Sequence, residues 1–412
     1  MSPKAIGKAN MSSIPLQAPP DKLITCDRDH SSYDICKING PTVLDPTTST
    51  FYVMDPKGPP VVEKIRPYAR KLEAQIMSGI KEVVLTSGPL GPPCQVHHKA
   101  PALVFSAGGY TGNFFHEFND GLIPLYITIN TIFNNDQEVV LVISKARDWW
   151  VSKYAELLRS FSKHPIVNLD NDTATHCFTS ASAGLITHGF MTIDPNRVQN
   201  PKTLIHFRAF LNRAYSHKKP HSNRQTHQRL SKSRPRLVLM SRNGAVGRVL
   251  LNQKQVKKEA EKVGFDVVVF EAKPSTPLQA AYELMNSSHA MVGVHGAGLT
   301  HALFLQPGSV LVQVVPLGTE WVAEACYGKA AKAMRLEYLE YRIEAEESSL
   351  IDKYGKGEMV IKDPIGFRGN NWTAEIMDLY LKNQNVRLDL ARFGGYLKEA
   401  YEKSIKLLDS HA

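Results

Sequence analysis

The stretch that decides the fold is Met291–Leu305, which reads MVGVHGAGLTHALFL. Its first residues form a short apolar run, which is typical of a strand buried on both faces of a sheet. Two glycines follow, Gly296 and Gly298, and an apolar segment that opens near Leu299 indicates a helix. A buried strand, a glycine-rich turn and a helix form the unit from which parallel α/β sheets are built. A tight turn that merely needs small residues is the alternative.

The same alternation of strands and helices continues on both sides of this stretch. In the second half of the chain, the apolar runs LVLM (237–240), VVVF (267–270) and VLVQVV (310–315) alternate with amphipathic segments. In the first half, ALVFS (102–106) and VVLVIS (139–144) are expected to be strands, and residues 61–78 a helix. Two such blocks separated by a polar linker predict an α/β fold with two Rossmann-like domains that face each other.

With 412 residues, the chain has room for two or three domains. The segments that we expect are a disordered N-terminal segment 1–22, a Rossmann-like domain 23–215, a basic linker 216–235, a second Rossmann-like domain 236–345, and a C-terminal helical segment 346–412. We expect the long helix of the last segment to pack back on the first domain.

Composition excludes several classes of protein. With 43% hydrophobic and 21% charged residues, the chain is neither fibrous nor wholly disordered. No apolar run approaches the roughly 18 residues that a membrane span needs, and the N-terminus has no secretory h-region. Any membrane anchor would therefore belong to a longer gene product or be absent. The net charge of +10 favours anionic partners, but the basic linker has no aromatic residues on which bases would stack, so we expect no nucleic acid.

The five cysteines do not form a CxxC pair, so zinc ribbons and thioredoxin chemistry are not indicated. Cys26 and Cys36 are close enough in sequence for a small disulfide loop, and Cys94 and Cys177 could join two distant segments. Cys326 falls in a predicted helix and is expected to be a buried free thiol. The four N-glycosylation sequons, which suit a lumenal glycoprotein, are at Asn10, Asn171, Asn286 and Asn371.

The turn in the deciding stretch has the features of a phosphate-binding site. Glycines allow the backbone to approach a phosphate, and the helix N-terminus supplies free N–H groups and positive potential. The spacing is G-x-x-G-x-G, which differs from the dinucleotide fingerprint G-x-G-x-x-G and argues against NAD. The residues predicted to meet a phosphate are His295, Gly296, Ala297 and Gly298.

A second stretch, LMSRNGAVGR (239–248), leaves the first strand of the second domain and carries Arg242 and Arg248. A guanidinium is a planar donor suited to bidentate phosphate binding. Either arginine alone is an ordinary loop residue. Together, at a strand end in the domain that holds the glycine turn, they predict a diphosphate clamp.

A third stretch, GGYTGNFFHEFNDGLIP (108–124), follows the ALVFS strand and is rich in polar side chains. His116 and Asp120 are four residues apart and share a helix face, whereas Glu117 points elsewhere. An acceptor hydroxyl needs a base, for which we rank Asp120 first, His116 second and Glu117 third. The alternative is a capped amphipathic helix whose polar face is exposed to solvent and has no catalytic role. H-E-x-x-D lacks the last zincin histidine, and both D-x-D triplets (27–29 and 170–172) are assigned to loops, so no metal is expected.

These stretches together resemble glycosyltransferase family 61, in particular its plant xylan-modifying branch. The resemblance runs from about Cys26 to about Ala400 and includes ITCDRDHSSYDIC (24–36), RPYARK (66–71), LEYLEYRIEAEESSL (336–350) and QNVRLDLARF (384–393). It implies a GT-B fold, an inverting mechanism, a UDP-sugar donor and a type II Golgi membrane protein. The chain departs from that pattern because it lacks the N-terminal anchor.

In a GT-B arrangement the donor would lie between the domains, held mostly by the second domain, with Glu271 and Glu320 near the ribose or uracil and Asn113 opposite. The expected activity is transfer of arabinose or xylose from a UDP-sugar to a xylan hydroxyl in the Golgi lumen, without a cofactor. The alternatives are β-1,2-xylosyl or N-acetylglucosaminyl transfer to glycoprotein, and an inactive carbohydrate-binding relative.

Overall fold

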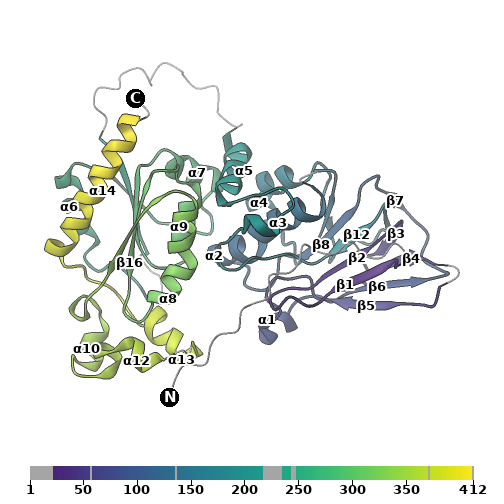
Figure 1. Ribbon diagram of the computed structural model, residues 1–412, viewed down its shortest axis with the longest axis horizontal. Coiled ribbons are helices and arrows are strands. Elements are labelled where there is room, and N and C mark those ends of the chain that lie inside the picture. The colour runs from purple at the N-terminus through teal and green to yellow at the C-terminus, as the bar shows by residue number, and fades with distance from the viewer. Residues whose placement is uncertain are drawn as a thin grey trace.

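The computed structural model describes residues 22–55, 58–134, 137–216, 234–242, 247–369 and 372–410. Almost all of the expected disordered segment and of the basic linker lies outside these ranges. The chain forms two halves that lie side by side, with the later residues on the left of Figure 1 and the earlier strands on the right. Within the described ranges, no helix is both long and apolar enough to cross a membrane.

The second half contains a five-stranded parallel sheet in the order β14-β13-β15-β16-β17. Its strands are β13 (Arg236–Met240), β14 (Asp266–Phe270), β15 (Ala290–Val294), β16 (Val310–Val315) and β17 (Glu337–Arg342). Counted from β13, the order is 2-1-3-4-5, that of a doubly wound fold. In such sheets the strand order reverses between the first and third strands, and ligands bind at their carboxyl ends. The sheet of the second half thus has the strand order of a Rossmann-like fold.

Helices cover both faces of this sheet. On one face are α7 (Leu278–Asn286), η3 (Ala297–Phe304), α8 (Glu320–Ala323), η4 (Glu324–Gly328) and α9 (Lys329–Ala333), and on the other are α6 (Gln253–Val263) and α14 (Leu390–Ser410). The prediction that the long C-terminal helix returns to the first domain is wrong. Phe393 and Leu397 of α14 are fully buried against this sheet and α6. The apolar side of α14 completes a face that α6 alone would leave partly open.

A series of short helices connects β17 to α14. They are η5 (Ala345–Glu347), α10 (Leu350–Tyr354), α11 (Met359–Lys362), α12 (Pro364–Arg368), α13 (Ala374–Met377) and η6 (Asp378–Lys382). Buried Gln384 fixes this region to the end of β16, because its side-chain amide donates to the Leu317 carbonyl at 3.1 Å and accepts from the Leu317 N–H at 2.9 Å. The predicted helical character of this region is confirmed.

The first half differs from the prediction, because it contains two mixed sheets rather than one sheet between helices. One has the order β1-β2-β12-β8-β9-β10 and the other β5-β6-β4-β3-β11-β7. Their strands are β1 (Ile24–Asp27), β2 (Ile35–Ile38), β3 (Thr42–Asp45), β4 (Thr50–Met54), β5 (Val62–Ile65), β6 (Val83–Gly88), β7 (Val96–His97), β8 (Ala102–Ser106), β9 (Val140–Ser144), β10 (Val167–Asn168), β11 (His176–Phe178) and β12 (Ala181–Ala183).

Helices cover only one face of the first sheet. Leu103 and Phe105 of β8 join the core beneath the helices, whereas Ala102 and Val104 join the core between the two sheets. The helices of this half are α1 (Ala74–Ser78), α2 (Phe114–His116), η1 (Glu117–Leu122), α3 (Ile123–Ile132), α4 (Asp148–Phe161), η2 (Pro195–Arg197) and α5 (Leu204–Ser216). The predicted helix 61–78 is mostly wrong, since its β-branched start forms β5 and Pro67 precludes a continuous helix.

Both suggested disulfides are present. Cys26–Cys36 joins the antiparallel pair β1 and β2, and Cys94–Cys177 joins β11 to the segment before β7. Cys326 is a buried free cysteine in η4, as predicted, and burial raises the pKa of its thiol to about 12.

The two halves share one hydrophobic core where α2 and α5 meet η3. The Phe114 ring stacks on the His301 ring with centroids 4.3 Å apart, and Phe118 meets Phe304 edge-on at 6.1 Å. In Figure 1, helices α2 to α5 lie between the sheet of the second half and the strands of the first.

Candidate active site

A cavity of about 580 Å³ lies at the junction of the two halves, within the size range of small-molecule sites. Its lining from the first half is Gly112, Asn113, Phe114, Glu117, Trp149, Lys153 and Tyr154, and from the second half Met240, Ser241, Arg242, Glu271, Ala272, Lys273, Pro274, Thr276, Leu278, Ala281, Ala297, Gly298 and His301. Arg242 follows β13 and Ala297 follows β15, so the cavity lies at the carboxyl ends of the strands between which the order reverses.

Arg242 and Arg248 converge on the turn after β15. A side chain at Gly296 would bring its Cβ 2.6 Å from Nη1 of Arg242 and 3.6 Å from Nη1 of Arg248. Gly296 also has a φ of 152°, which disfavours other residues. The absence of a side chain at Gly296 therefore leaves room for both guanidinium groups. The arginine stretch 239–248 and the glycine turn, which the sequence analysis singles out separately, lie next to each other in the structure.

The charges of the two guanidinium groups are not balanced by a carboxylate in the described part of the chain. Among the described residues, no carboxylate forms an ion pair with Arg242 or Arg248, and the buried Nε of Arg248 has no hydrogen-bond partner. Burial lowers the pKa of both side chains, and together with the charge of Arg242 it brings that of Arg248 to about 10. Because two partly buried cations without a carboxylate partner are unfavourable neighbours, an anionic ligand would stabilise this arrangement.

His295 supports the turn from behind and does not line the cavity. It is 4% exposed, and its Nδ1 accepts a hydrogen bond of 2.9 Å from Nε2 of Gln313. Burial lowers the pKa of His295 to about 3, so the ring is neutral. The Tyr327 hydroxyl donates to the Gly296 carbonyl at 2.8 Å and fixes the same turn. The His295 side chain thus supports the turn from inside the protein, while Ala297 and Gly298 line the cavity.

Of the other residues predicted to contact the donor, two line the cavity and one does not. Glu271 and Asn113 line the cavity, and the Asn113 side chain also caps α2 by accepting from the Phe115 N–H at 3.0 Å. Glu320 does not line the cavity. It opens α8, and its Oε2 is buried without a hydrogen-bond partner among the described residues.

Asp120 lies at the centre of a buried hydrogen-bond cluster in η1. Its carboxylate accepts from Arg70 through Nε at 2.9 Å and Nη2 at 2.7 Å, from Tyr68 at 3.1 Å and from Asn119 at 2.6 Å, and lies 2.8 Å from Nδ1 of His116. Burial alone would raise the pKa of Asp120, but the His116 hydrogen bond and the Arg70 charge outweigh it and hold the pKa below its usual value. This geometry orients His116.

His116 and Glu117 lie on different sides of the same turn. The His116 ring stacks on Tyr110 at 4.1 Å, and no described residue hydrogen-bonds to its Nε2. Glu117 lines the cavity, but one carboxylate oxygen accepts from the Gly112 N–H at 2.8 Å and the other from Trp150 Nε1 at 2.7 Å. Burial raises the pKa of Glu117. All three predicted bases are therefore brought together, with His116 offering the free nitrogen.

Sequence reasoning gave no role to Arg70, Tyr68 or His301. The RPYARK stretch that holds Arg70 and Tyr68 is about 50 residues from Asp120, so no spacing rule indicates their contact. His301 belongs to the deciding stretch, but only the fold shows that it stacks on Phe114 in the cavity wall.

The two D-x-D triplets do not line the cavity. Asp170 pairs with Lys81 at 3.2 Å, Asp172 with His176 at 3.1 Å, and Asp27 accepts from the Asp29 N–H at 3.1 Å. Contrary to expectation, Asp27 ends strand β1. Each triplet thus has local partners.

This combination of α/β halves, cationic glycine turn and junction cavity is that of a glycosyltransferase, and the chain belongs to glycosyltransferase family 61. The model of that family matches residues 114–312. A xylan glycosyltransferase of Arabidopsis thaliana, MUCI21, is 41% identical, with 97% of this chain and 83% of that protein covered.

Two rice (Oryza sativa subsp. japonica) proteins are also similar. The β-1,2-xylosyltransferase XYXT1 is 35% identical, with 92% of this chain and 84% of that protein covered, and the α-1,3-arabinosyltransferase XAT3 is 36% identical, with 92% and 65% covered. Among solved structures, the glycosyltransferase TibC of E. coli covers 81% of this chain and 84% of its own at 12% identity, but its TM-score of 0.31 is too low to carry an argument.

Proposed function

We propose that this chain is an inverting glycosyltransferase of the GT-B type that moves arabinose or xylose from a UDP-sugar to a hydroxyl of the xylan backbone, in the Golgi lumen. The observation that carries the proposal is the pair of partly buried arginines at the glycine turn, which have no carboxylate partner among the described residues and lie beside a cavity of about 580 Å³. Xylan and pentoses come from the names of the relatives, several of which transfer xylose or arabinose.

The donor diphosphate would lie against Arg242, Arg248 and the N–H groups that open η3. Negative charge grows on the diphosphate as the bond from its oxygen to the anomeric carbon breaks. Fixed guanidinium groups stabilise that charge more in the transition state than in the ground state, and so lower the barrier. Two arginines supply the positive charge for which other enzymes use a metal, so no cofactor is invoked. Glu271, in the cavity wall, is placed to accept from ribose or uracil.

The acceptor hydroxyl would lose its proton to Nε2 of His116 as its oxygen attacks the anomeric carbon from the face opposite UDP. Asp120 holds Nδ1 of His116 and stabilises the imidazolium that forms. Arg70 and Tyr68 hold Asp120 in turn. This assignment exchanges the first two positions of the ranking that the sequence alone suggests, because five donor contacts occupy Asp120.

The function is tested by offering UDP-xylose, UDP-arabinose and UDP-N-acetylglucosamine, each with xylohexaose and with an N-glycopeptide. We expect a pentose on xylohexaose, with inverted anomeric configuration by NMR. Transfer only to the glycopeptide, or retention of configuration, would contradict the proposal.

The assignment of the base is tested with three variants. His116→Ala should lower transfer about 10²–10⁴-fold while UDP binding persists. Asp120→Asn should also lose most transfer, because the amide would not hold the His116 ring in the orientation that leaves Nε2 available as the base. Glu117→Gln is the matched comparison at the next position, and we expect it to retain more activity than either. A dead Glu117→Gln beside an active His116→Ala would identify Glu117 as the base.

A further inference from the structure

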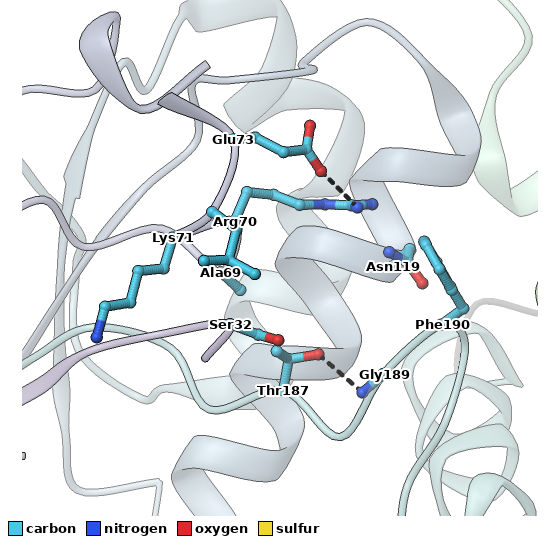
Figure 2. Close-up of a pocket in the computed structure, with 10 residues that line it drawn as sticks. Ser32, Ala69, Arg70, Lys71, Glu73, Asn119, Thr187, Gly189 and Phe190 are labelled. Carbon is cyan, nitrogen blue, oxygen red and sulfur yellow. Dashed lines mark hydrogen bonds and ion pairs between the residues drawn. The ribbon is translucent and has the colours of Figure 1, made fainter. Parts of the chain in front are cut away.

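A second cavity, of about 180 Å³, lies in the first half beside the His116–Asp120 pair. Its wall includes Arg70, Glu73, Asn119, Thr187 and Phe190. Figure 2 shows the Arg70 guanidinium reaching toward Asn119 and the Phe190 ring, while the Lys71 side chain points the opposite way. None of these residues was assigned a role by the sequence.

The charges of this cavity are balanced within the protein. Arg70 pairs with Glu73 at 2.9 Å and with Asp120 at 2.7 Å, and Lys71 pairs with Asp34 at 2.8 Å. Each cation in the wall therefore has a carboxylate partner, unlike the arginines of the donor site. A phosphate or a uronic acid would find no free positive charge here, so the wall suits a neutral ligand.

The same wall combines hydrogen-bonding groups with aromatic rings. Arg70, Glu73, Asn119 and Thr187 place polar side-chain atoms in the wall. Each of these residues also forms a hydrogen bond within the protein, and sugar hydroxyls, which both donate and accept, can share such groups. The Phe190 ring meets Trp321 edge-on, with centroids 6.4 Å apart, and Trp321 is 54% exposed. The C–H face of a pyranose is apolar and weakly positive, so it packs on the negative face of an aromatic ring.

The rings continue from the first half to the second. Trp321 lies at the start of α8, and its ring is 6.2 Å from that of Trp372, which precedes α13. We call Phe190, Trp321 and Trp372 the aromatic row. It begins at the cavity and extends along more than one ring width, which fits a chain of sugars better than a single one.

The cavity connects directly to the proposed base. Arg70 lines it, binds Asp120 through two nitrogens, and brings its Nη2 within 3.4 Å of Nδ1 of His116. A sugar in this cavity would therefore touch the side chain that holds the base in place.

We propose that this cavity and the aromatic row bind the acceptor, as a neutral chain of pentopyranose units, adjacent to the unit that receives the new sugar. The proposal rests on the proposed function, and it adds the place and the chemistry of acceptor recognition.

The experiment measures binding of xylohexaose to the intact protein by calorimetry without UDP, and transfer to xylobiose and xylohexaose. Phe190→Ala and Trp321→Ala should each weaken xylohexaose binding roughly 2- to 10-fold, the contribution of one stacked ring, and leave UDP affinity unchanged. The preference for xylohexaose over xylobiose should fall by a similar factor. Trp321→Phe should recover part of the loss, and Trp321→Leu less.

Leu90→Ala is the matched control, since Leu90 is 84% exposed and lines neither cavity. Normal xylohexaose binding by both aromatic variants would overturn the inference, as would tighter binding of a sulfated xylo-oligosaccharide than of the neutral one. Either result with intact transfer by the wild type would leave the proposed function standing. If the wild type bound xylohexaose but neither bound UDP nor transferred sugar, the proposed function would be refuted, whereas the inference that the cavity binds a xylan chain would stand.

Discussion

Arginine is used in opposite ways in the two halves of this molecule. Arg70, in the first half, has two carboxylate partners and joins a closed network around Asp120. Arg242 and Arg248, in the second half, have no carboxylate partner among the described residues and face each other across Gly296. The guanidinium with carboxylate partners joins parts of the fold, whereas the pair without them is the one that we propose to bind the diphosphate. The same residue type therefore indicates either structure or binding, depending on the charges around it.

The largest effect that the comparison predicts is on stability, at Arg70. Arg70→Met would leave the 1% exposed Asp120 carboxylate buried without its cation. Breaking such a pair from one side typically costs about 3–5 kcal/mol, which urea unfolding at pH 7 would detect. Arg28→Met is the control, because Arg28 is 39% exposed and its two carboxylate partners, Glu63 and Asp34, are 37% and 19% exposed, so these ion pairs are far more solvated than the Arg70–Asp120 pair. An exposed ion pair is worth about 1 kcal/mol or less. Equal effects of the two substitutions would contradict the distinction.

Arg242→Ala should have the reverse signature. Removing one of two partly buried cations that have no carboxylate partner among the described residues should leave the free energy of unfolding without ligand unchanged or higher. Transfer should fall about 10²–10³-fold, because a fixed donor to the leaving diphosphate is lost, and UDP should no longer raise the melting temperature. Arg242→Lys should recover little, since an ammonium group cannot make the bidentate contact. A destabilised Arg242→Ala protein with normal kinetics would assign Arg242 a structural role instead.

Two buried histidines and the half-buried His188 predict an intermediate effect of pH on stability. Burial lowers the pKa of His188 to about 4, of His295 to about 3 and of His301 to about 4. Between pH 6.5 and about 4 the unfolded chain therefore binds more protons than the folded chain, so stability falls as the pH falls. Each histidine contributes up to about 1.4 kcal/mol per pH unit in that window. Urea unfolding at pH 7, 6 and 5 measures the slope.

His188→Gln is the matched variant for that experiment, because His188 lies outside the donor cavity. This variant should have a smaller slope of unfolding free energy against pH, because one histidine fewer takes up a proton on unfolding. A stability that is flat between pH 7 and 5 in the wild type would mean that these rings are protonated in the folded protein.

The smallest effect is expected from a chelator. If the two arginines supply the positive charge at the diphosphate, transfer after EDTA treatment should stay within about twofold of the untreated rate. Loss of activity that Mn²⁺ restores would show that a metal acts with the arginines, and Asp170 and Asp172 would be the first residues to replace.

How far the sequence predicted the fold differs between the halves for a physical reason. In the second half each strand is a continuous apolar run followed by a helix, and the order of elements along the chain is nearly their order in the sheet. In the first half β12 pairs with β2 and β8, although about 140 and 80 residues separate them in sequence. Local patterns carry no information about such pairings, so the two-sheet arrangement was missed.

The candidate site follows the same rule. Arg242, Arg248 and Gly296 were found because glycines and arginines at strand ends have a direct chemical meaning. The support of Asp120 by Arg70 and Tyr68, and the inward direction of His295, depend on contacts between distant segments. The docking of α14 was mispredicted because an amphipathic helix shows that it has an apolar face but not which sheet that face covers.

The shared core between the halves has a consequence for how the reaction is set up. Phe114 on His301 and Phe118 against Phe304 fill the junction with packed rings, and the first pair lines the cavity at the junction. Rings in such contact do not slide freely, so the junction resists hinge motion. In the proposed mechanism, the angle between the base and the leaving group is therefore set when the chain folds, and does not await closure around the donor. Rate differences between donor sugars would then reflect how each sugar fits a fixed gap.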